Sequence, residues 1–556
     1  MQQKLKSLTQ KLRTVILTYP LVLAMAAVMA STIVYMIENE HAIKNEFWPA
    51  RVIIVSGLGI SLLFALTMLA QRTGKQLWAA LGIVILVGYY FILPQTEEQF
   101  TEVYVFLLVP TFVLSHLLVA TAPFLGKQPE QNFWQYNKNL FVNLFLTVIF
   151  TGVLTGGVEL AILAVDQLFS MKFDSKIYGD TFFILSIIGS VFIFLLFSGK
   201  GLEDLEQDSK YPIVLKFFTQ FILIPLLLIY VVILYFYSGK ILLKWQLPEG
   251  WVSYLVLAYS ILGILALLLV HPLKGDSAKS WVKIFSKLFY FSLIPLLILL
   301  FTAIFTRVLE YGFTEPRYYV LLLAIWLLSV VLYFVFAKRT TIKFIPISLF
   351  LFGLFSLVFP FLNTFSVSRI SQERELNRLL ETNHLLNNGK IDFSKAVPYK
   401  AANDIDDKFR YLSKRFNKEY LSDLLDAKAL KEMDGDRTWY IGYLFKNKIG
   451  QADNQNTVSS RVYSRNHVAD IGDYQFVVQQ QYLNGDGTKI GNDRLTSDVN
   501  MYGSEPKLML KLNDRDSLDF MPLTKKLLMK YRGADKETDS LFVEGELGKY
   551  HVKAMF

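Results

Sequence analysis

The sequence predicts an α-helical polytopic membrane bundle of about eleven transmembrane helices, followed by a C-terminal soluble α+β domain. Eleven mostly apolar stretches fill the chain up to residue 365. Each is close to the ~20 residues that a helix needs to cross a hydrocarbon core of ~30 Å. From Ser366 to Phe556 the composition changes to an ordinary charged mixture. These observations predict a transmembrane domain, residues 1–365, and a soluble domain, residues 366–556.

The apolar stretches are continuous, which is typical of helices, because strands of membrane barrels alternate apolar and polar residues. The first stretch follows a basic segment, but it is too long for a signal peptide and lacks a small-residue cleavage site. We therefore expect an uncleaved first span. The expected spans are 14–37, 52–70, 77–93, 103–125, 140–168, 180–198, 213–237, 251–270, 286–306, 318–337 and 344–365.

The basic residues of the loops predict the orientation, because Lys and Arg are enriched in cytoplasmic loops. With the N-terminus in the cytoplasm, the cytoplasmic segments hold sixteen Lys and Arg residues and the opposite segments hold eight. An odd number of spans then places the C-terminal domain outside the cytoplasm. We expect a cytoplasmic N-terminus and an extracytoplasmic C-terminal domain.

The soluble domain begins with a helical pattern and continues with strands. Apolar residues at helical spacing predict one helix rising from the last span over 366–386 and a second over 403–433. Residues 484–487 predict a hairpin turn, and residues 517–531 predict a third helix. The expected strands, which should form an antiparallel sheet, are 438–445, 461–465, 473–483, 507–513, 541–547 and 549–556.

The composition excludes several classes of function. The chain has no cysteine, which rules out disulfides, thiolate catalysis and Cys-ligated metals. Residues 366–556 hold 30 Lys and Arg against 28 Asp and Glu, and this near balance argues against a nucleic-acid partner. The P-loop, serine-hydrolase, zinc-protease and dinucleotide-binding motifs are absent. We expect no metal and no cofactor, and the sequence favours a protein that is not an enzyme.

The first candidate site is a set of ionisable residues inside the predicted spans. Glu159 and Asp166 are seven residues apart, so they lie on one face of a helix, and His116 lies within another span. Ionisable groups in lipid are costly and often mark a proton or cation path. Alternatively, Gly152 and Gly156 permit close helix packing, with Glu159 bonded to a neighbouring helix, Asp166 at the outer interface and His116 a hydrogen-bonded packing residue.

The predicted outer loops carry an acidic bias. One loop contains Glu38, Glu40 and Glu46, and the next contains a second group of three, Glu97, Glu98 and Glu102. Carboxylates gathered at one surface can hold a divalent cation, which prefers hard oxygen ligands. The alternative is that the acidic loops complement the basic loops on the other side.

The second candidate site is the loop that joins the ninth and tenth predicted spans. It contains Arg307, Glu310, Tyr311 and Arg317, together with a Gly-Phe-Thr-Glu-Pro sequence that predicts a turn before a helix. Arginines at the outer membrane face can bind a phosphate or a carboxylate. The alternative is a structured turn with Arg–Glu pairing and an interfacial tyrosine belt.

Three short strings resemble those of a bacterial family catalogued as domain of unknown function 4153. They are Tyr311-Gly-Phe-Thr-Glu-Pro-Arg317-Tyr318 preceded by Arg307, Phe133-Trp134-Gln-Tyr136-Asn137-Lys138, and Gly472-Asp473-Tyr474. The resemblance implies a multi-pass bacterial inner-membrane protein. It implies no activity, substrate or catalytic residue.

Three functions fit these patterns. The preferred one is a non-enzymatic membrane protein that anchors an extracytoplasmic partner-binding or sensing domain. Its expected partners are the lipid bilayer and an envelope protein or a lipid-linked ligand. The second is a secondary transporter that uses the intramembrane carboxylates. The third is a polyprenyl-linked sugar transferase, which the short first outer loop disfavours, because such enzymes typically carry a large one.

Overall fold

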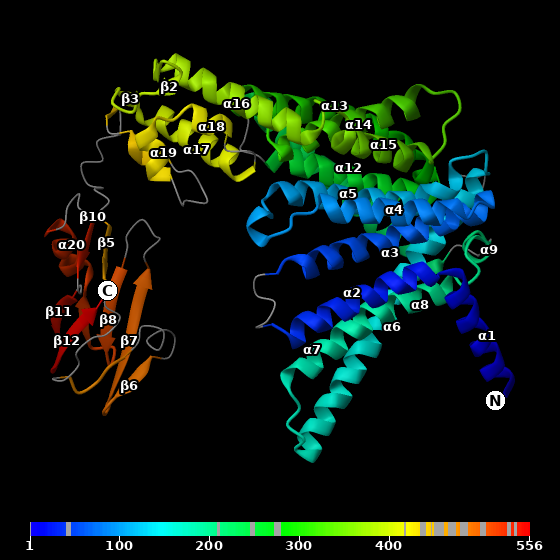
Figure 1. Cartoon of the computed structure of the whole chain (residues 1–556), viewed down its shortest axis with the longest axis horizontal. Coiled ribbons are helices and arrows are strands. Elements are labelled where there is room, and N and C mark those ends of the chain that lie inside the picture. Colours follow the sequence, from blue (N-terminus) through cyan, green and yellow to red (C-terminus); the bar gives the residue numbers. More distant parts are fainter. Residues whose placement is uncertain are drawn as a thin grey trace. The chain divides into compact units, whose positions relative to one another are not determined.

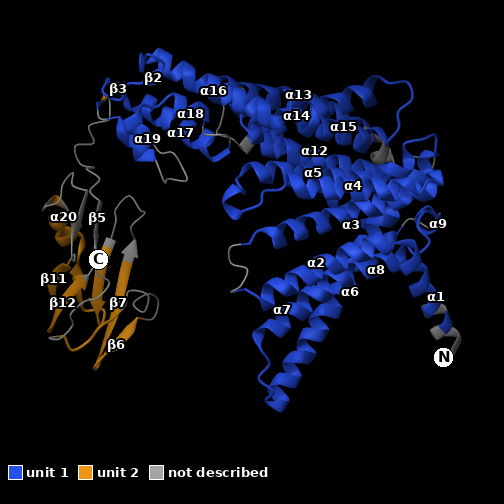
Figure 2. Cartoon of the chain, viewed as in Figure 1, with its two compact units in different colours: residues 1–447 blue, residues 448–556 orange. Residues whose placement is uncertain are grey.

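The computed structural model divides into two compact units, residues 1–447 and residues 448–556, each of which is described by itself (Figure 2). The predicted boundary between residues 365 and 366 concerns the end of the membrane region and stays a prediction. The residues that the structure describes are 2–40, 46–207, 212–244, 251–271, 280–415, 419–433, 441–445, 447–449, 461–464, 474–478, 487–500, 507–530, 535–538 and 542–555.

Each of the eleven predicted spans coincides with an apolar helix in the described part of the chain, so the predicted membrane bundle is confirmed. Among the described residues, nine helices or runs of adjoining helical segments are long and apolar enough to cross a bilayer, and two are shorter. The long ones are α2 (Pro20–Glu38), α3 (Trp48–Thr73), α5 (Val103–Thr121) with η2 (Ala122–Phe124), α6 (Glu130–Phe169), α7 (Ser175–Ile184) with η3 (Leu185–Gly189) and α8 (Ser190–Phe197), η4 (Phe218–Leu223) with α11 (Ile224–Lys244), α12 (Trp251–Val270), α13 (Ser280–Tyr311) and α14 (Glu315–Phe336); the shorter ones are α4 (Leu77–Ile92) and α15 (Phe344–Val358).

Short elements interrupt or precede these helices. The predicted first span starts inside α1 (Gln2–Thr18). The helix is interrupted at Tyr19, and Pro20 begins α2. Pro is favoured in the first turn of a helix, where its missing N–H has no partner to lose. The segments η3 and η4 are π-helical turns. The other short elements are η1 (Glu97–Gln99), α9 (Leu202–Leu205) and α10 (Ile213–Phe217).

Contacts between helix termini show which helix ends lie together. We call the end of the helices where α2 begins the proximal end, and the end where α2 stops the distal end. At the proximal end Trp134 of α6 bonds the carbonyl of Leu268, near the end of α12. At the distal end Tyr318 of α14 bonds the carbonyl of Leu362, which follows α15. In Figure 1, α1 and α9 lie at the proximal end, and α16 begins at the distal end.

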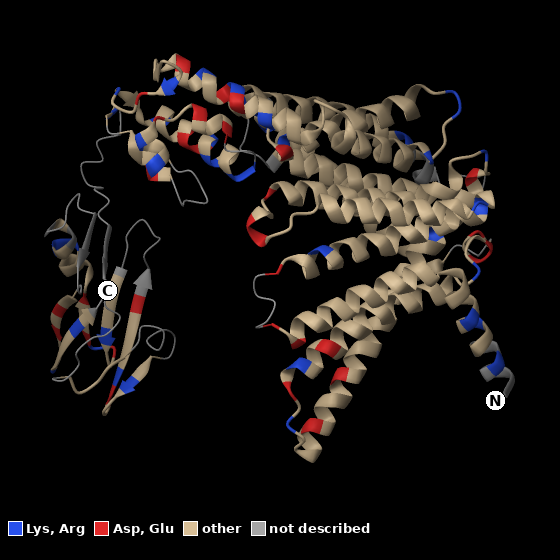
Figure 3. Cartoon of the chain, viewed as in Figure 1, with Lys and Arg blue, Asp and Glu red and all other residues tan. Residues whose placement is uncertain are grey.

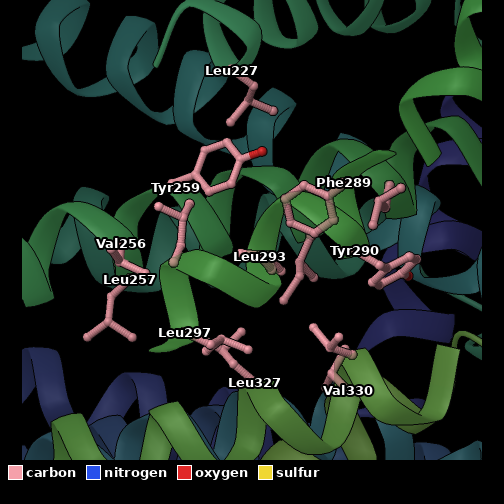
Figure 4. Packing of buried hydrophobic residues seen from close by; sticks show 14 of the residues in the cluster. Leu227, Val256, Leu257, Tyr259, Phe289, Tyr290, Leu293, Leu297, Leu327 and Val330 are labelled. Carbon is pink, nitrogen blue, oxygen red and sulfur yellow. The ribbon is translucent and has the colours of Figure 1, made fainter. Parts of the chain in front are cut away.

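Two apolar clusters form the core of the helical region. One joins α2, α3 and the first part of α6, and the other joins α11 to α15. Figure 4 shows Tyr259, Phe289, Leu293 and Leu327 of the second cluster facing one another across α12, α13 and α14. Gly263 of α12 is required for this packing, because a methyl group there would overlap the Phe289 ring.

A helical cap, which we define as the described residues of 364–447, follows the last apolar helix. The predicted span 344–365 ends early, because Pro360 and the positive φ of Phe361 (63°) interrupt the helical structure between α15 and α16 (Thr364–Thr382). The predicted helix 403–433 is wrong in extent, since the helix begins earlier, at Tyr399, and residues 424–426 are not helical. The remaining cap elements are β1 (Leu386–Asn387), β2 (Lys390–Ile391), β3 (Val397–Pro398), α17 (Tyr399–Arg415), α18 (Glu419–Asp423), α19 (Ala427–Met433) and η6 (Gly442–Leu444).

The cap has its own apolar core. Leu376 and Leu380 of α16 pack with Ile405, Phe409 and Leu412 of α17, and all five are fully or almost fully buried. The buried positions of α16 recur every four residues, from Thr364 through Leu380, so one face of the helix is covered along its length. The predicted strand 438–445 is wrong over its described residues, which form the short turn η6.

The second unit, residues 448–556, is an α+β domain, as predicted. A four-stranded antiparallel sheet has the order β6-β7-β8-β9, β11 and β12 form a hairpin, and β10 pairs with β5 in parallel. Val499 lies opposite Leu508 in the β7–β8 register. The strands are β4 (Lys448–Ile449), β5 (Arg461–Ser464), β6 (Thr488–Ile490), β7 (Asp493–Asn500), β8 (Lys507–Leu512), β9 (Asp516–Asp519), β10 (Asp535–Thr538), β11 (Phe542–Leu547) and β12 (Tyr550–Met555).

Four of the predicted strands in this unit are confirmed as β5, β8, β11 and β12. The strand predicted over 473–483 is wrong for its described residues, 474–478, and the rest lies outside the described part. The predicted helix 517–531 starts late, at Met521 of α20 (Met521–Lys530), because the residues before it pair with β8 as β9. Most of the predicted hairpin turn 484–487 also lies outside the described residues.

Candidate functional site

The first candidate site lies on one face of α6, which is 40 residues, or about 60 Å, long. Thr147, Thr151, Thr155 and Glu159 recur every four residues and therefore share this face. The three threonines are buried, at 4%, 9% and 5% exposure. The helix packs along α7, η3 and α8. A polar stripe thus runs inside the apolar region, and the sequence prediction had found only Glu159 of its members.

Three oxygens of this stripe lack a hydrogen-bond partner in the described structure: Oγ1 of Thr151, Oγ1 of Thr155 and Oε1 of Glu159. Buried polar atoms are nearly always paired, so such oxygens indicate a site that a ligand, water or proton can occupy. Asp180 of α7 also has an unpaired buried oxygen, Oδ1. The stripe can accept hydrogen bonds or coordinate a cation.

The other predicted members of this site lie elsewhere or have local roles. Asp166 accepts a hydrogen bond of 2.9 Å from the backbone N–H of Phe173, so its carboxylate closes the turn after α6. His116 shares a hydrogen bond of 2.8 Å with the carbonyl of Phe112 on its own helix. That helix, α5, packs mainly on α3 and α15. The structure therefore does not bring His116 to the α6 stripe.

Gly152 and Gly156 of α6 do not mediate helix packing among the described residues. A Cβ atom at Gly152 or Gly156 would meet no atom within 4 Å. The predicted alternative of close helix contact through these glycines is therefore absent from the described part of the chain.

The second candidate site is the turn between α13 and α14 at the distal end, where it forms a seam with the helical cap. Gly312 has φ of 74°, a conformation that a glycine adopts without strain. Gln372 of α16 donates to the carbonyls of Tyr311 and Phe313, at 3.0 and 2.7 Å. Ser371 accepts from the Phe313 N–H at 2.8 Å. The cap helix α16 thus holds the backbone of the turn.

Arg317 belongs to the same turn but pairs with no carboxylate in the described structure. Its Nη1 donates to the carbonyls of Gly312 and Tyr311, at 2.7 and 3.3 Å, and its guanidinium lies 5.4 Å from the centre of the Tyr311 ring. Arg307 and Glu310 both lie within electrostatic range of Arg317. The four predicted residues are therefore brought together, and Arg317 also closes the turn.

Two residues of α17 complete the seam and were not predicted. Lys408 donates to the carbonyl of Tyr311 at 2.9 Å. Burial lowers the pKa of Lys408, and the positive charge of Arg317 lowers it further. Tyr411 donates to Oε2 of Glu315 at 2.7 Å. Burial, followed by the charge of Glu315, raises the pKa of Tyr411.

A buried ion pair anchors the end of α17. Glu315, the first residue of α14, is completely buried, and its Oε1 lies 3.4 Å from Nε of Arg415. The same arginine binds Glu102, which precedes α5, and Lys414 lies 3.8 Å from Glu102. The guanidinium of Arg415 also stacks 4.4 Å from the centre of the Tyr411 ring. Arg415 thus bridges one buried and one exposed carboxylate of the membrane region.

The acidic loops of the distal end do not form a metal centre in the described part of the chain. No group of three or more Asp, Glu or His residues with the arrangement of a metal site occurs among the described residues. Figure 3 shows acidic residues on the loop before α5. One of them, Glu102, forms an ion pair with Arg415 of the cap.

The string Phe133 to Lys138 forms a polar hub at the proximal end. Phe133, Trp134, Gln135, Tyr136 and Lys138 are all buried. The Tyr136 hydroxyl donates to the carbonyl of a residue near the end of α5, at 2.9 Å. The hub therefore joins α6 to its neighbours at this end and has the character of a structural junction.

Comparisons with known proteins identify a family. A family model described as "Domain of unknown function (DUF4153)" matches residues 22–398. An uncharacterised protein of Pasteurella multocida (strain Pm70) is 27% identical over 326 residues, which cover 58% of this chain and 52% of the relative. The match thus spans about half the length of that relative. No solved structure matches the chain.

Proposed function

This chain belongs to that family of unknown function, as a bacterial multi-pass membrane protein, and we propose that it anchors a partner-binding or sensing domain on the extracytoplasmic side of the inner membrane. The apolar helices are the anchor. The helical cap connects them to the α+β unit, which carries the surface for an envelope partner or a lipid-linked ligand.

The observation that best supports this proposal is the buried contact between the cap and the membrane region. A mobile tether would need no buried charge, yet Glu315 is completely buried. It forms an ion pair with Arg415 and accepts a hydrogen bond from Tyr411, both on α17. Burying an unpaired carboxylate costs several kcal/mol, so the three side chains stabilise only the docked cap. The cap is thus held in a fixed position, as a protein that transmits or presents a binding event requires.

Photo-cross-linking in intact cells tests this proposal. A photoreactive amino acid is introduced at Val477 of the α+β unit, which is 63% exposed, and as a matched control at Val84 of α4, which is 67% exposed on an apolar helix. The proposal predicts a discrete envelope protein or lipid-linked product from Val477 and lipid products alone from Val84. If Val477 and further exposed positions of the unit yield no product other than lipid, the proposal is wrong.

Transport is the second candidate function, and the α6 stripe is the observation that favours it. The unpaired oxygens of Thr151, Thr155 and Glu159 lie in sequence along one helix face and can pass a proton or a cation from one to the next. A π-helical turn such as η3, against which α6 packs, often marks a functional site.

Flux in proteoliposomes tests the transport candidate. Under an imposed proton or sodium gradient, Glu159→Gln should abolish flux, whereas Glu97→Gln, a change at an exposed glutamate of the distal end, should leave it intact. Equal flux in the two variants, or no flux from the unmodified protein, would exclude transport through this stripe as a function.

A further inference from the structure

Three cations from three helices gather at the seam between the α13–α14 turn and the cap. Arg307 lies one turn before the end of α13, Arg317 in the first turn of α14, and Lys408 on α17. Arg307 interacts electrostatically with Arg317, and Arg317 interacts with Lys408. Like charges repel at such range, so their gathering needs opposite charge nearby. Within electrostatic range of these cations lie the carboxylates of Glu310, Glu375, Asp404 and Asp407.

The nearby carboxylates do not supply that charge through direct ion pairs. Among the described residues, no carboxylate oxygen lies within 4 Å of the charged nitrogens of Arg307, Arg317 or Lys408, whereas most other charged residues of α16 and α17 form such pairs. Glu375, for example, is bound by Arg378 at 2.7 Å. Asp404 lies within electrostatic range of Lys408 without pairing. The three cations therefore differ from the paired charges around them.

Hydrogen-bond capacity at this seam is also incompletely used. A guanidinium has five N–H donors and an ammonium has three, whereas a carbonyl oxygen has two lone pairs. The carbonyl of Tyr311 already faces three donors, from Arg317, Gln372 and Lys408. Arg317 uses only Nη1 in the hydrogen bonds of the described structure. The Tyr311 carbonyl thus meets more donors than its two lone pairs can take.

The position of the seam identifies the chemistry of the missing acceptor. The apolar part of α13 ends at Tyr311 and that of α14 begins at Glu315, so the cations lie where the apolar helices stop. At this level a bilayer presents its phosphate groups. Arg and Lys bind phosphate oxygens by short, charge-assisted hydrogen bonds.

We propose that Arg307, Arg317 and Lys408 form a binding site for the phosphate group of an anionic lipid at the seam between the membrane region and the helical cap. The phosphate bridges α13, α14 and α17, so its binding stabilises the docked cap. This inference goes beyond the proposed function, because it holds whether or not the α+β unit binds a partner.

The test measures lipid affinity of the purified full-length protein in detergent micelles. The midpoint of thermal unfolding is followed against the concentration of added dimyristoyl phosphatidylglycerol, which gives an apparent dissociation constant. The double variant R307Q/K408Q removes two charges but keeps a side-chain donor near Tyr311. The matched control R374Q/K400Q removes one Arg and one Lys from exposed positions of α16 and α17.

We expect R307Q/K408Q to weaken phosphatidylglycerol binding by about tenfold or more, since the variant removes two charge-assisted contacts to the phosphate. R374Q/K400Q should change it by less than about twofold. If the double variant fails to fold, R307Q alone gives the test, because Arg307 makes no hydrogen bond in the described structure. Equal affinities in the two double variants, or equal stabilisation by phosphatidylcholine, would overturn the proposal.

Inorganic phosphate distinguishes the two sources of the ligand. Displacement of phosphatidylglycerol by inorganic phosphate at constant ionic strength would show that the phosphate group alone suffices. No displacement would show that the acyl chains are needed as well. Both results support the site provided that R307Q/K408Q reduces binding.

Discussion

Replacing Arg415 by alanine should release the helical cap from the membrane region. Glu315 is completely buried, and Arg415 is 13% exposed in its side chain, so the pair is largely removed from water. Removing one partner of such a pair typically costs ~3–5 kcal/mol, because the other charge stays buried without compensation. The partial exposure of Arg415 favours the lower end of this range, which corresponds to an increase of about 100-fold in the open population.

Hydrogen exchange of the full-length protein in nanodiscs measures that population. Peptides covering α16 and α17 should exchange about 100-fold faster in Arg415→Ala. The matched control is Glu102→Ala, which removes the exposed partner of the same arginine. An exposed pair contributes ~0–1 kcal/mol, so this change should accelerate exchange by at most about fivefold. Equal acceleration in the two variants would refute the role given to the buried pair.

Three further predictions concern stability. Gly312→Ala should destabilise the cap contact by ~1–2 kcal/mol in the same exchange experiment, because φ is 74° and the new methyl would lie 2.9 Å from Nε2 of Gln372. Gly263→Ala should lower the unfolding midpoint in detergent, because the methyl overlaps the Phe289 ring. Hydrogen bonds from its neighbours lower the pKa of Asp493 to about 2. The ionised Asp493 carboxylate therefore stabilises the fold fully above its ordinary pKa of about 4, and this stabilisation is lost as the pH falls towards 2. Pepsin cleavage of residues 488–512 should accordingly depend less on pH over this window in Asp493→Asn than in the unmodified protein.

The apolar helices could be predicted because hydropathy alone sets where a helix enters lipid. All eleven predicted stretches coincide with helices in the described part, and the main errors lie at breaks such as Pro20 and Pro360. At these two positions a proline opens a helix or follows the end of one. The predicted helix 403–433 was wrong in extent because apolar residues at helical spacing continue across the break between α18 and α19.

The α+β unit was harder to predict because its strands are less apolar. The strand β7, Asp493–Asn500, contains few apolar residues, and its pairing with β8 comes from long-range register that local pattern does not reveal. Ser517 to Asp519 lie at the start of a helical pattern, yet pairing with β8 keeps them in β9. In both cases pairing with β8, rather than the local sequence pattern, determines the secondary structure.

The candidate site was predicted in part. The turn containing Arg307 and Arg317 was recognised from its composition, but Lys408 and Arg415 are some ninety residues further along the chain, and only the folded cap brings them there. By contrast, the threonines of the α6 stripe recur every four residues, so the periodicity that relates Thr147 to Glu159 was readable from the sequence.

Accessibility of single cysteines in intact spheroplasts tests the account most directly, because it reports the side of the membrane on which each end of the helices lies. The chain has no natural cysteine, so Val477→Cys in the exposed α+β unit and Lys75→Cys in the exposed proximal loop give unambiguous signals. An impermeant thiol reagent should label the cysteine at 477 without lysis and the one at 75 only after lysis. The reverse pattern would contradict the extracytoplasmic placement on which the proposed function depends.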